Sequence, residues 1–352
     1  MTNDKQAYAA GVVALIGSGE TSPQGRSLFD KVMSRFTPGP SVAILETPAG
    51  FELNSAQVAG RIADFVRDHL QNHQPRVNVV PARKRGTSFS PDDPAIVKPV
   101  LDADLIFMGP GSPTYAVRQL RDSLVWQYLT ARHRLGGAIV LASAAAIAFS
   151  SYTLPVYEIY KVGQDVHWKP GLDFFGFYGL NLVVVPHWNN QDGGDGLDTS
   201  RCFIGKSRFA ILLNALPPNV TVLGIDERSA LILDLAGKSA HVQGLGGVTI
   251  LQDQHARRFI AGDQFPLGVL GEARFPDPGS DLTAGVWEQA LAVHQSAQAV
   301  PVAPQEVEAL VAAREEARRL QEWSYADRLR ERILEMGWEV RDTPDGPRVA
   351  PQ

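Results

Sequence analysis

The first part of the chain alternates between short apolar runs and longer amphipathic stretches. Each apolar run has four or five residues and is bounded by Gly, Pro or Asp, which is typical of strands covered on both faces. The runs predict strands at Val12–Ile16, Val42–Leu45, Val77–Val80, Leu105–Met108, Ile139–Ala142 and Leu182–Val185. The stretches between them predict helices at Arg26–Phe36, Ser55–Leu70, Pro113–Arg121 and Leu124–His133. This alternation predicts an α/β domain with a mostly parallel sheet and helices on both faces.

The pattern changes after Val222, where shorter strand-like pieces are separated by glycines. We expect them to form hairpins that extend the sheet: Leu231–Leu235, His241–Gln243 and Val248–Leu251. Prolines and glycines then punctuate residues 271–304, which we interpret as a linker in which Trp287–Ala297 could form one helix.

A helical pattern returns at Gln305, and a second helix is expected to end near Gly337. The sequence therefore predicts an α/β domain over residues 1–270, a linker over 271–304 and a C-terminal helical hairpin over 305–352.

Composition narrows the class of protein. Of 352 residues, 44% are hydrophobic and 20% are charged, so a large buried core is feasible. The net charge of −5 does not favour binding to nucleic acid or to an anionic membrane. One cysteine, Cys202, excludes an intrachain disulfide framework and a cysteine-rich metal site. No apolar run is long enough to cross a bilayer, and the start lacks a signal-peptide cleavage site. We expect a cytoplasmic protein without a metal or cofactor.

Ser143 is the candidate nucleophile. It stands where the apolar run Ala138–Ala142 meets the helix-favouring run Ala144–Ala148. A serine at a sharp strand-to-helix turn exposes its hydroxyl, and the Ala144 N–H at the start of the helix can stabilise an oxyanion. The alternative is a serine that only caps the helix.

His187 is the candidate base, in Pro186-His187-Trp188 directly after a predicted strand. The carboxyl ends of strands form the edge at which α/β sheets bind ligands. The alternative is an ordinary hydrogen-bonded histidine. A Ser–His pair needs a third group to orient the imidazole, for which Glu158 is our first candidate and Glu227 the second.

These residues resemble the cyanophycinase/dipeptidase E family of serine peptidases. The resemblance covers roughly Val12 to Leu251, and its parts follow the family order. They are Gly17-Ser18-Gly19-Glu20, Gly109-Pro110-Gly111-Ser112, Ser143, Pro186-His187-Trp188 and Gly224-Ile225-Asp226-Glu227. The family implies a class I glutamine amidotransferase-like sheet that uses serine in place of cysteine.

The resemblance also implies roles for individual residues. The acid some fifteen residues beyond the nucleophile falls on Glu158, and the loop Gly109–Gly111 would supply a second oxyanion N–H, with Gly111 as the expected donor. Family members cleave next to aspartate, and basic residues bind the acidic group. Arg201 and Arg208 occupy the matching stretch here.

The nucleophile segment departs from the family pattern, Gly-x-Ser-Ala-Gly. Leu141 and Ala145 stand in place of the two glycines. Ala145 adds one methyl group, whereas Leu141 is bulkier and could reshape the turn. This departure motivates an alternative in which the domain keeps the fold as a catalytically silent binding module.

The C-terminal segment resembles the extreme C-terminus of cysteinyl-tRNA synthetases. The matching pieces are Ala313–Arg318, Tyr325–Arg330 and Asp342–Gly346. In those enzymes this region belongs to the tRNA-binding end. Here, however, residues 305–352 hold eight arginines and eleven acidic residues, a net charge of −3 that does not favour phosphate contacts. We therefore favour an interaction or dimerisation hairpin over a tRNA-binding one.

Cys202 falls in a helix-like stretch, Thr199–Leu213, and we interpret it as a buried structural cysteine. The leading hypothesis is a metal-independent serine peptidase that hydrolyses short or aspartate-containing peptides through an acyl-enzyme. The expected partner is a peptide substrate, and no membrane partner is expected. For the tail we favour a second copy of the chain, with tRNA as the alternative.

Overall fold

The computed structural model describes residues 8–253, 255–298, 303–343 and 346–351. The chain divides into two compact units, Met1–His294 and Gln295–Gln352, which are described separately below.

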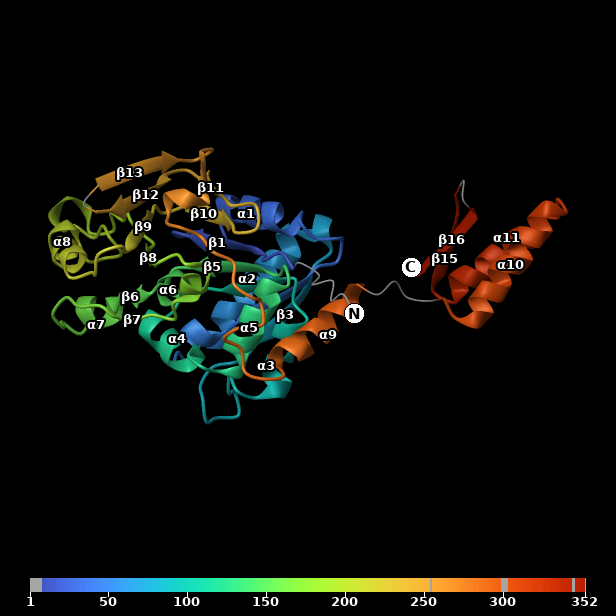
Figure 1. The fold of residues 1–352 in the computed structure, drawn as a ribbon, viewed down its shortest axis with the longest axis horizontal. Coiled ribbons are helices and arrows are strands. Elements are labelled where there is room, and N and C mark those ends of the chain that lie inside the picture. The colour runs from blue at the N-terminus through green and yellow to red at the C-terminus, as the bar shows by residue number, and fades with distance from the viewer. Residues whose placement is uncertain (1–7, 254, 299–302, 344–345, 352) are drawn as a thin grey trace. The chain divides into compact units, whose positions relative to one another are not determined.

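An eight-stranded sheet forms the centre of the first unit, with the order β14-β11-β10-β1-β5-β4-β2-β3 (Figure 1). Its five parallel strands are β1 (Val12–Ile16), β5 (Ala138–Ala142), β4 (Leu105–Met108), β2 (Ser41–Leu45) and β3 (Arg76–Val80). Antiparallel strands extend it on the β1 side: β10 (Ser229–Asp234), β11 (Ser239–Gly244) and β14 (Gln264–Pro266). The predicted α/β class with a mostly parallel sheet is confirmed.

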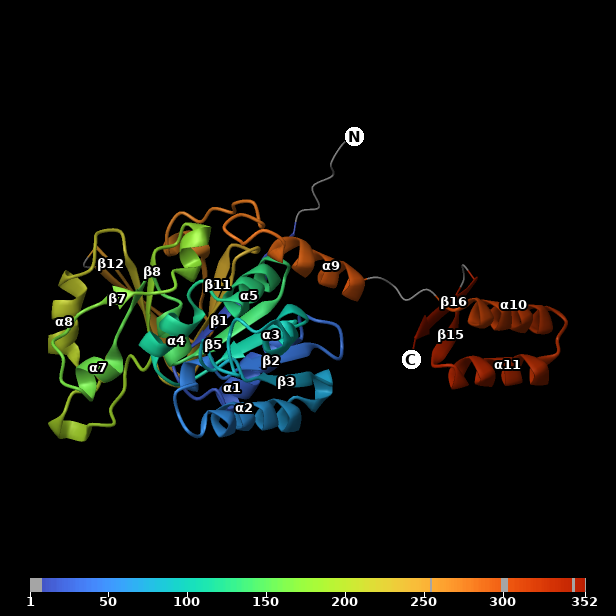
Figure 2. The same ribbon diagram turned by 90° about the horizontal axis from the view of Figure 1, so that it is seen from below.

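Helices cover both faces of this sheet (Figure 2). Alternate strand residues pack against α1 (Pro23–Met33) and α2 (Ser55–His69) on one face. The other residues pack against the helices of the opposite face, α3 (Pro94–Leu101), α4 (Pro113–Leu120) and α5 (Leu124–Arg134). This period-two division of fully buried strands explains why the sequence shows continuous apolar runs there.

The sequence missed α3, which is short and carries Pro99 in its interior. Within the described ranges, no helix combines the length and the apolar character that a membrane span requires.

A second sheet of four strands differs from the prediction. Its order is β13-β12-β9-β8, with bounds His255–Ile260, Gly247–Gln252, Thr221–Ile225 and Leu182–Val185. The strand predicted at Leu182–Val185 therefore forms, but it pairs in parallel with β9 and not with the main sheet. Of the predicted hairpin strands, only β10 and β11 extend the main sheet. Strand pairing is non-local, so an apolar run alone does not identify its partner.

Residues 271–294, predicted as part of a linker, belong to the first unit. Val286 and Ala290 of α9 (Val286–Gln298) are buried in its core, and Gln289 accepts a hydrogen bond from the Tyr128 hydroxyl at 2.9 Å. Arg134 donates to the carbonyl of Ser280 at 2.6 Å. The unit boundary falls between His294 and Gln295, later in the chain than residue 270.

The second unit contains the predicted helical hairpin, α10 (Gln305–Arg319) and α11 (Trp323–Glu335). A β-hairpin that the sequence did not predict follows it, β15 (Trp338–Thr343) and β16 (Gly346–Pro351). Arg314 of α10 is only 3% exposed and binds both carboxylate oxygens of Asp342 at 2.8 and 2.9 Å. This bidentate pair joins the helices to the β-hairpin.

We expect Arg314→Met to loosen the second unit, because it removes a bidentate charge-assisted contact to Asp342. A loss of about 1–3 kcal/mol would reduce amide hydrogen-exchange protection in α10 and β15 by roughly 5- to 150-fold. Arg332→Met is the matched control, since Arg332 pairs with Glu335 on the exposed surface. Equal protection in both variants would contradict this role of Arg314.

Candidate active site

Ser143 forms a strained turn between β5 and α6 (Ala144–Ala148). Its backbone angles are φ 51° and ψ −117°, outside the regions that non-glycine residues favour, at a cost of about 1–3 kcal/mol. Its side chain makes no capping hydrogen bond to the helix, so the helix-cap alternative does not describe this serine. Leu141 is fully buried in the core beside the turn, and the turn forms with leucine at that position.

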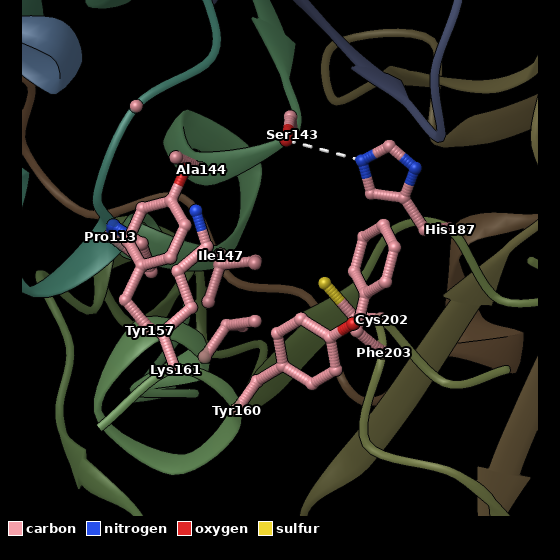
Figure 3. A pocket seen from close by; sticks show the side chains of 12 residues that line it. Pro113, Ser143, Ala144, Ile147, Tyr157, Tyr160, Lys161, His187, Cys202 and Phe203 are labelled. Atoms are coloured by element: carbon pink, nitrogen blue, oxygen red, sulfur yellow. Dashed lines mark hydrogen bonds between the residues drawn. The ribbon is translucent and has the colours of Figure 1, made fainter. Parts of the chain in front are cut away.

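The Ser143 hydroxyl meets the imidazole of His187 (Figure 3). The distance from Ser143 Oγ to His187 Nε2 is 3.2 Å. Strand register explains why these two side chains are in contact. Strand β1 runs beside β5, so Gly17 follows β1 next to Ser143, and its carbonyl accepts a hydrogen bond from the His187 N–H at 3.1 Å. Gly17 must lack a Cβ, because a side chain there would overlap the Asp226 carbonyl.

Glu227 contacts the other ring nitrogen of His187. The distance from His187 Nδ1 to Glu227 Oε1 is 3.1 Å. Strands β8 and β9 place the two residues side by side, because Val185 lies opposite Gly224 in their parallel register. An ionised carboxylate can only accept a hydrogen bond, so Nδ1 carries the proton and Nε2 is free to accept the serine proton.

Two asparagines hold Glu227 in place. Asn190 Nδ2 donates to Glu227 Oε1 at 2.9 Å, and Asn189 Oδ1 accepts from the Glu227 N–H at 2.8 Å. Neither asparagine was predicted from the sequence, although they directly follow His187 and Trp188. Polar residues directly after a candidate base are the signal that could have found them.

Glu158, the first candidate for the third group, lies elsewhere. It is on α7 (Val156–Tyr160), where Lys169 Nζ contacts its Oε1 at 3.4 Å. Of the two carboxylates that the sequence left open, the structure brings Glu227 to His187. Glu158 lines a neighbouring hollow.

Two residues that line the space beside Ser143 have backbone N–H groups without an intramolecular partner among the described residues. Ala144 begins α6, and Gly111 follows β4; both line the same cavity. Gly111 has φ +146°, and a Cβ there would overlap the Pro48 carbonyl, so only glycine fits. Among the described residues neither N–H has a hydrogen-bond acceptor, as an oxyanion site requires.

The cavity has a volume of about 310 Å³ and includes Ser143 and His187. Most of its wall is apolar or aromatic, from residues that the sequence analysis did not select: Pro113, Ile147, Val156, Tyr157, Tyr160 and Phe203. Within the ranges that the structure describes, no cluster of three His, Cys, Asp or Glu side chains could hold a metal ion.

Comparison with solved structures identifies the fold of the first unit. A peptidase from an acI-B1 Actinobacterium matches with a TM-score of 0.59 and 24% sequence identity, over 74% of this chain and 98% of that one. The first unit has the fold of a known peptidase. We call it the peptidase-fold unit.

The C-terminal resemblance is also confirmed. Residues 300–348 match the cysteinyl-tRNA ligase anticodon binding domain. The cysteine–tRNA ligase of Rubrobacter xylanophilus is 58% identical over 45 residues, and that of Methanosarcina mazei is 46% identical over 46 residues. Each match covers 13% of this chain and 10% of the ligase, so the chain spans about one tenth of these relatives.

The two arginines expected to bind substrate do not line the cavity of the peptidase-fold unit. Arg201 Nη1 donates to the Trp188 carbonyl at 2.8 Å, and its guanidinium stacks 3.6 Å from a Trp188 ring centroid. Arg208 Nε donates to the Ile204 carbonyl at 2.7 Å. Both side chains therefore support the local backbone.

Cys202 does not lie in a helix, because α8 begins only at Lys206 (Lys206–Asn214). Arg201, Cys202 and Phe203 instead form a left-handed turn with φ of 57°, 58° and 65°. This turn brings Cys202 and Phe203 to the cavity wall. Burial raises the pKa of the Cys202 thiol to about 12, and the charge of Glu227 adds to the shift, so the thiol is a poor nucleophile.

Asp198 anchors this turn. Its Oδ1 accepts from the Ser200 hydroxyl at 2.6 Å and its Oδ2 from the Lys206 N–H at 2.8 Å. The Ser200 hydroxyl and the Lys206 N–H lower the pKa of Asp198 to about 2. A lowered pKa stabilises the fold above the unfolded value near 3.9, and this contribution is lost as pH falls toward 2.

We expect Asp198→Ala to reduce the free energy of unfolding by about 1 kcal/mol at pH 6, because it removes the acceptor of the Ser200 hydroxyl and of the Lys206 N–H. The difference from wild type should shrink as pH falls from 5 to 3, in urea unfolding at each pH. Asp195→Ala, an exposed change in the same loop, is the control. A pH-independent difference would show that the ionised carboxylate is not what stabilises the turn.

Proposed function

We propose that the protein is a serine peptidase that hydrolyses short or aspartate-containing peptides through an acyl-enzyme. The observation that carries the proposal is the continuous hydrogen-bonded series Ser143–His187–Glu227 beside a cavity with two free N–H groups. The peptidase fold supports the class of reaction. The family resemblance of the motifs supports the choice of substrate.

In the proposed reaction, Ser143 Oγ attacks the peptide carbonyl carbon while His187 Nε2 accepts the hydroxyl proton. Glu227 stabilises the imidazolium, and the N–H groups of Ala144 and Gly111 bind the oxyanion. The imidazolium then protonates the leaving amine as the C–N bond breaks. Water, deprotonated by His187, hydrolyses the acyl-enzyme and regenerates the serine.

A fluorophosphonate probe tests the nucleophile and the third group. Wild type should become labelled and Ser143→Ala should not. Glu227→Gln should slow labelling by on the order of 10²- to 10⁴-fold, because the amide no longer fixes the imidazole tautomer. Glu158→Gln, the matched control, should stay within a few-fold of wild type.

Two results would contradict this assignment. Slow labelling of Glu158→Gln with normal labelling of Glu227→Gln would assign the third catalytic group to Glu158 in place of Glu227. Absence of label in folded wild type would favour the alternative, a silent binding module of the same fold.

The second unit supports a further candidate function, binding of tRNA. Beside the match to an anticodon binding domain, Trp323 and Tyr325 in the first turn of α11 are 57% and 44% exposed. Arg318 lies 5.9 Å from the Trp323 ring centroid, and Arg328 lies 5.5 Å from that of Tyr325. Exposed rings flanked by arginine are typical of surfaces on which unpaired bases stack.

We expect the full chain to shift tRNA in a gel in a salt-dependent way, and deletion of residues 305–352 to abolish the shift. Replacing Trp323 and Tyr325 together with alanine should weaken binding by roughly tenfold or more, because each stacked base contributes about 1–3 kcal/mol. Dimers that need residues 305–352, without a tRNA shift, would instead support the dimerisation hairpin.

A further inference from the structure

Lys161 brings a positive charge to a cavity wall that is otherwise mostly apolar. It follows α7 directly and lines the cavity together with Ser143, Tyr157 and Phe203. Figure 3 shows its side chain pointing into the cavity beside the Tyr157 ring. The Lys161 Nζ lies 4.8 Å from the centroid of that ring.

The Lys161 ammonium has no ion-pair partner among the described residues. Lys169, by contrast, contacts Glu158 at 3.4 Å. Glu52 and Glu158 line the hollow next to the cavity, but neither forms an ion pair with Lys161 in the described part of the chain. Lys161 is itself exposed, so its ammonium is accessible to an anionic group of a ligand that enters the cavity.

The same side chain reaches a second hollow. This hollow has a volume of about 680 Å³ and shares Tyr157 and Lys161 with the cavity beside Ser143. Lys161 therefore stands where the two spaces adjoin. A ligand in either space can therefore contact the Lys161 side chain.

We propose that Lys161 is a specificity-determining residue that binds a carboxylate of the peptide substrate, while the apolar wall contacts the substrate's carbon atoms. This inference rests on the proposed peptidase function. Binding of the substrate's acidic group, which the sequence predicted for Arg201 and Arg208, is here proposed for Lys161. The guanidinium groups of Arg201 and Arg208 instead bind backbone carbonyls. The carboxylate can come from an acidic side chain or from the C-terminus of a short peptide.

The test measures binding of matched short peptides to the full chain with Ser143→Ala, which prevents turnover. One pair differs as aspartate against asparagine, and the other as free C-terminus against C-terminal amide. In the protein that carries only Ser143→Ala, we expect the carboxylate peptide of one pair to bind 10- to 100-fold more tightly than its neutral partner. Adding Lys161→Met should bring that preference close to one, and Lys161→Glu should reverse it. The pair that responds identifies the source of the carboxylate.

Lys98→Met is the matched control, since Lys98 is an exposed lysine of α3 outside both hollows, and it should keep the preference. No preference before substitution, or a preference that survives Lys161→Met, would overturn the inference. Failure of the proposed function is seen separately, as absence of fluorophosphonate label on Ser143 in the protein without substitutions. If the fluorophosphonate labels wild type but the preference for the carboxylate peptide does not depend on Lys161, the peptidase proposal holds and the role proposed for Lys161 is wrong.

Discussion

The strained backbone of Ser143 is the constraint on which the site depends. With φ at 51° and ψ at −117°, the chain leaves β5 and enters α6 within one residue, so the serine side chain stays clear of both elements. Surrounding structure must stabilise such a conformation. Here the fully buried strand β5 and the buried alanines of α6 fix the chain on either side. The strain is offset by core packing, and the result is a hydroxyl that makes no bond to its own helix.

The remaining groups reach Ser143 through strand register. Parallel pairing of β1 with β5 places Gly17 beside the serine, and parallel pairing of β8 with β9 places Glu227 beside His187. The bond from the His187 N–H to the Gly17 carbonyl then links the second sheet to the first. Each contact is short because backbone hydrogen bonds, and not flexible side chains, set the positions of the reacting groups.

The sequence predicted local features well and long-range ones poorly. Fully buried strands are continuous apolar runs, so the six predicted strands were found to within one residue, and Ser143 and His187 stood at the ends of two of them. Strand pairing depends on residues far apart in the sequence. The sequence therefore did not predict the second sheet, nor that Glu227 and not Glu158 contacts His187. The left-handed turn at Arg201–Phe203 turns Arg201 toward Trp188, and no sequence signal marks three consecutive non-glycine residues with positive φ. Lys161 was missed because α7 is too short to show a helical period.

A crystal structure of the protein after reaction with a phosphonate inhibitor would show whether Ser143, His187 and Glu227 act together. We expect phosphorus bonded to Ser143 Oγ, one phosphonyl oxygen accepting from both the Ala144 and Gly111 N–H groups, and His187 still hydrogen-bonded to Glu227. An adduct on another residue, or a phosphonyl oxygen directed away from both N–H groups, would contradict it.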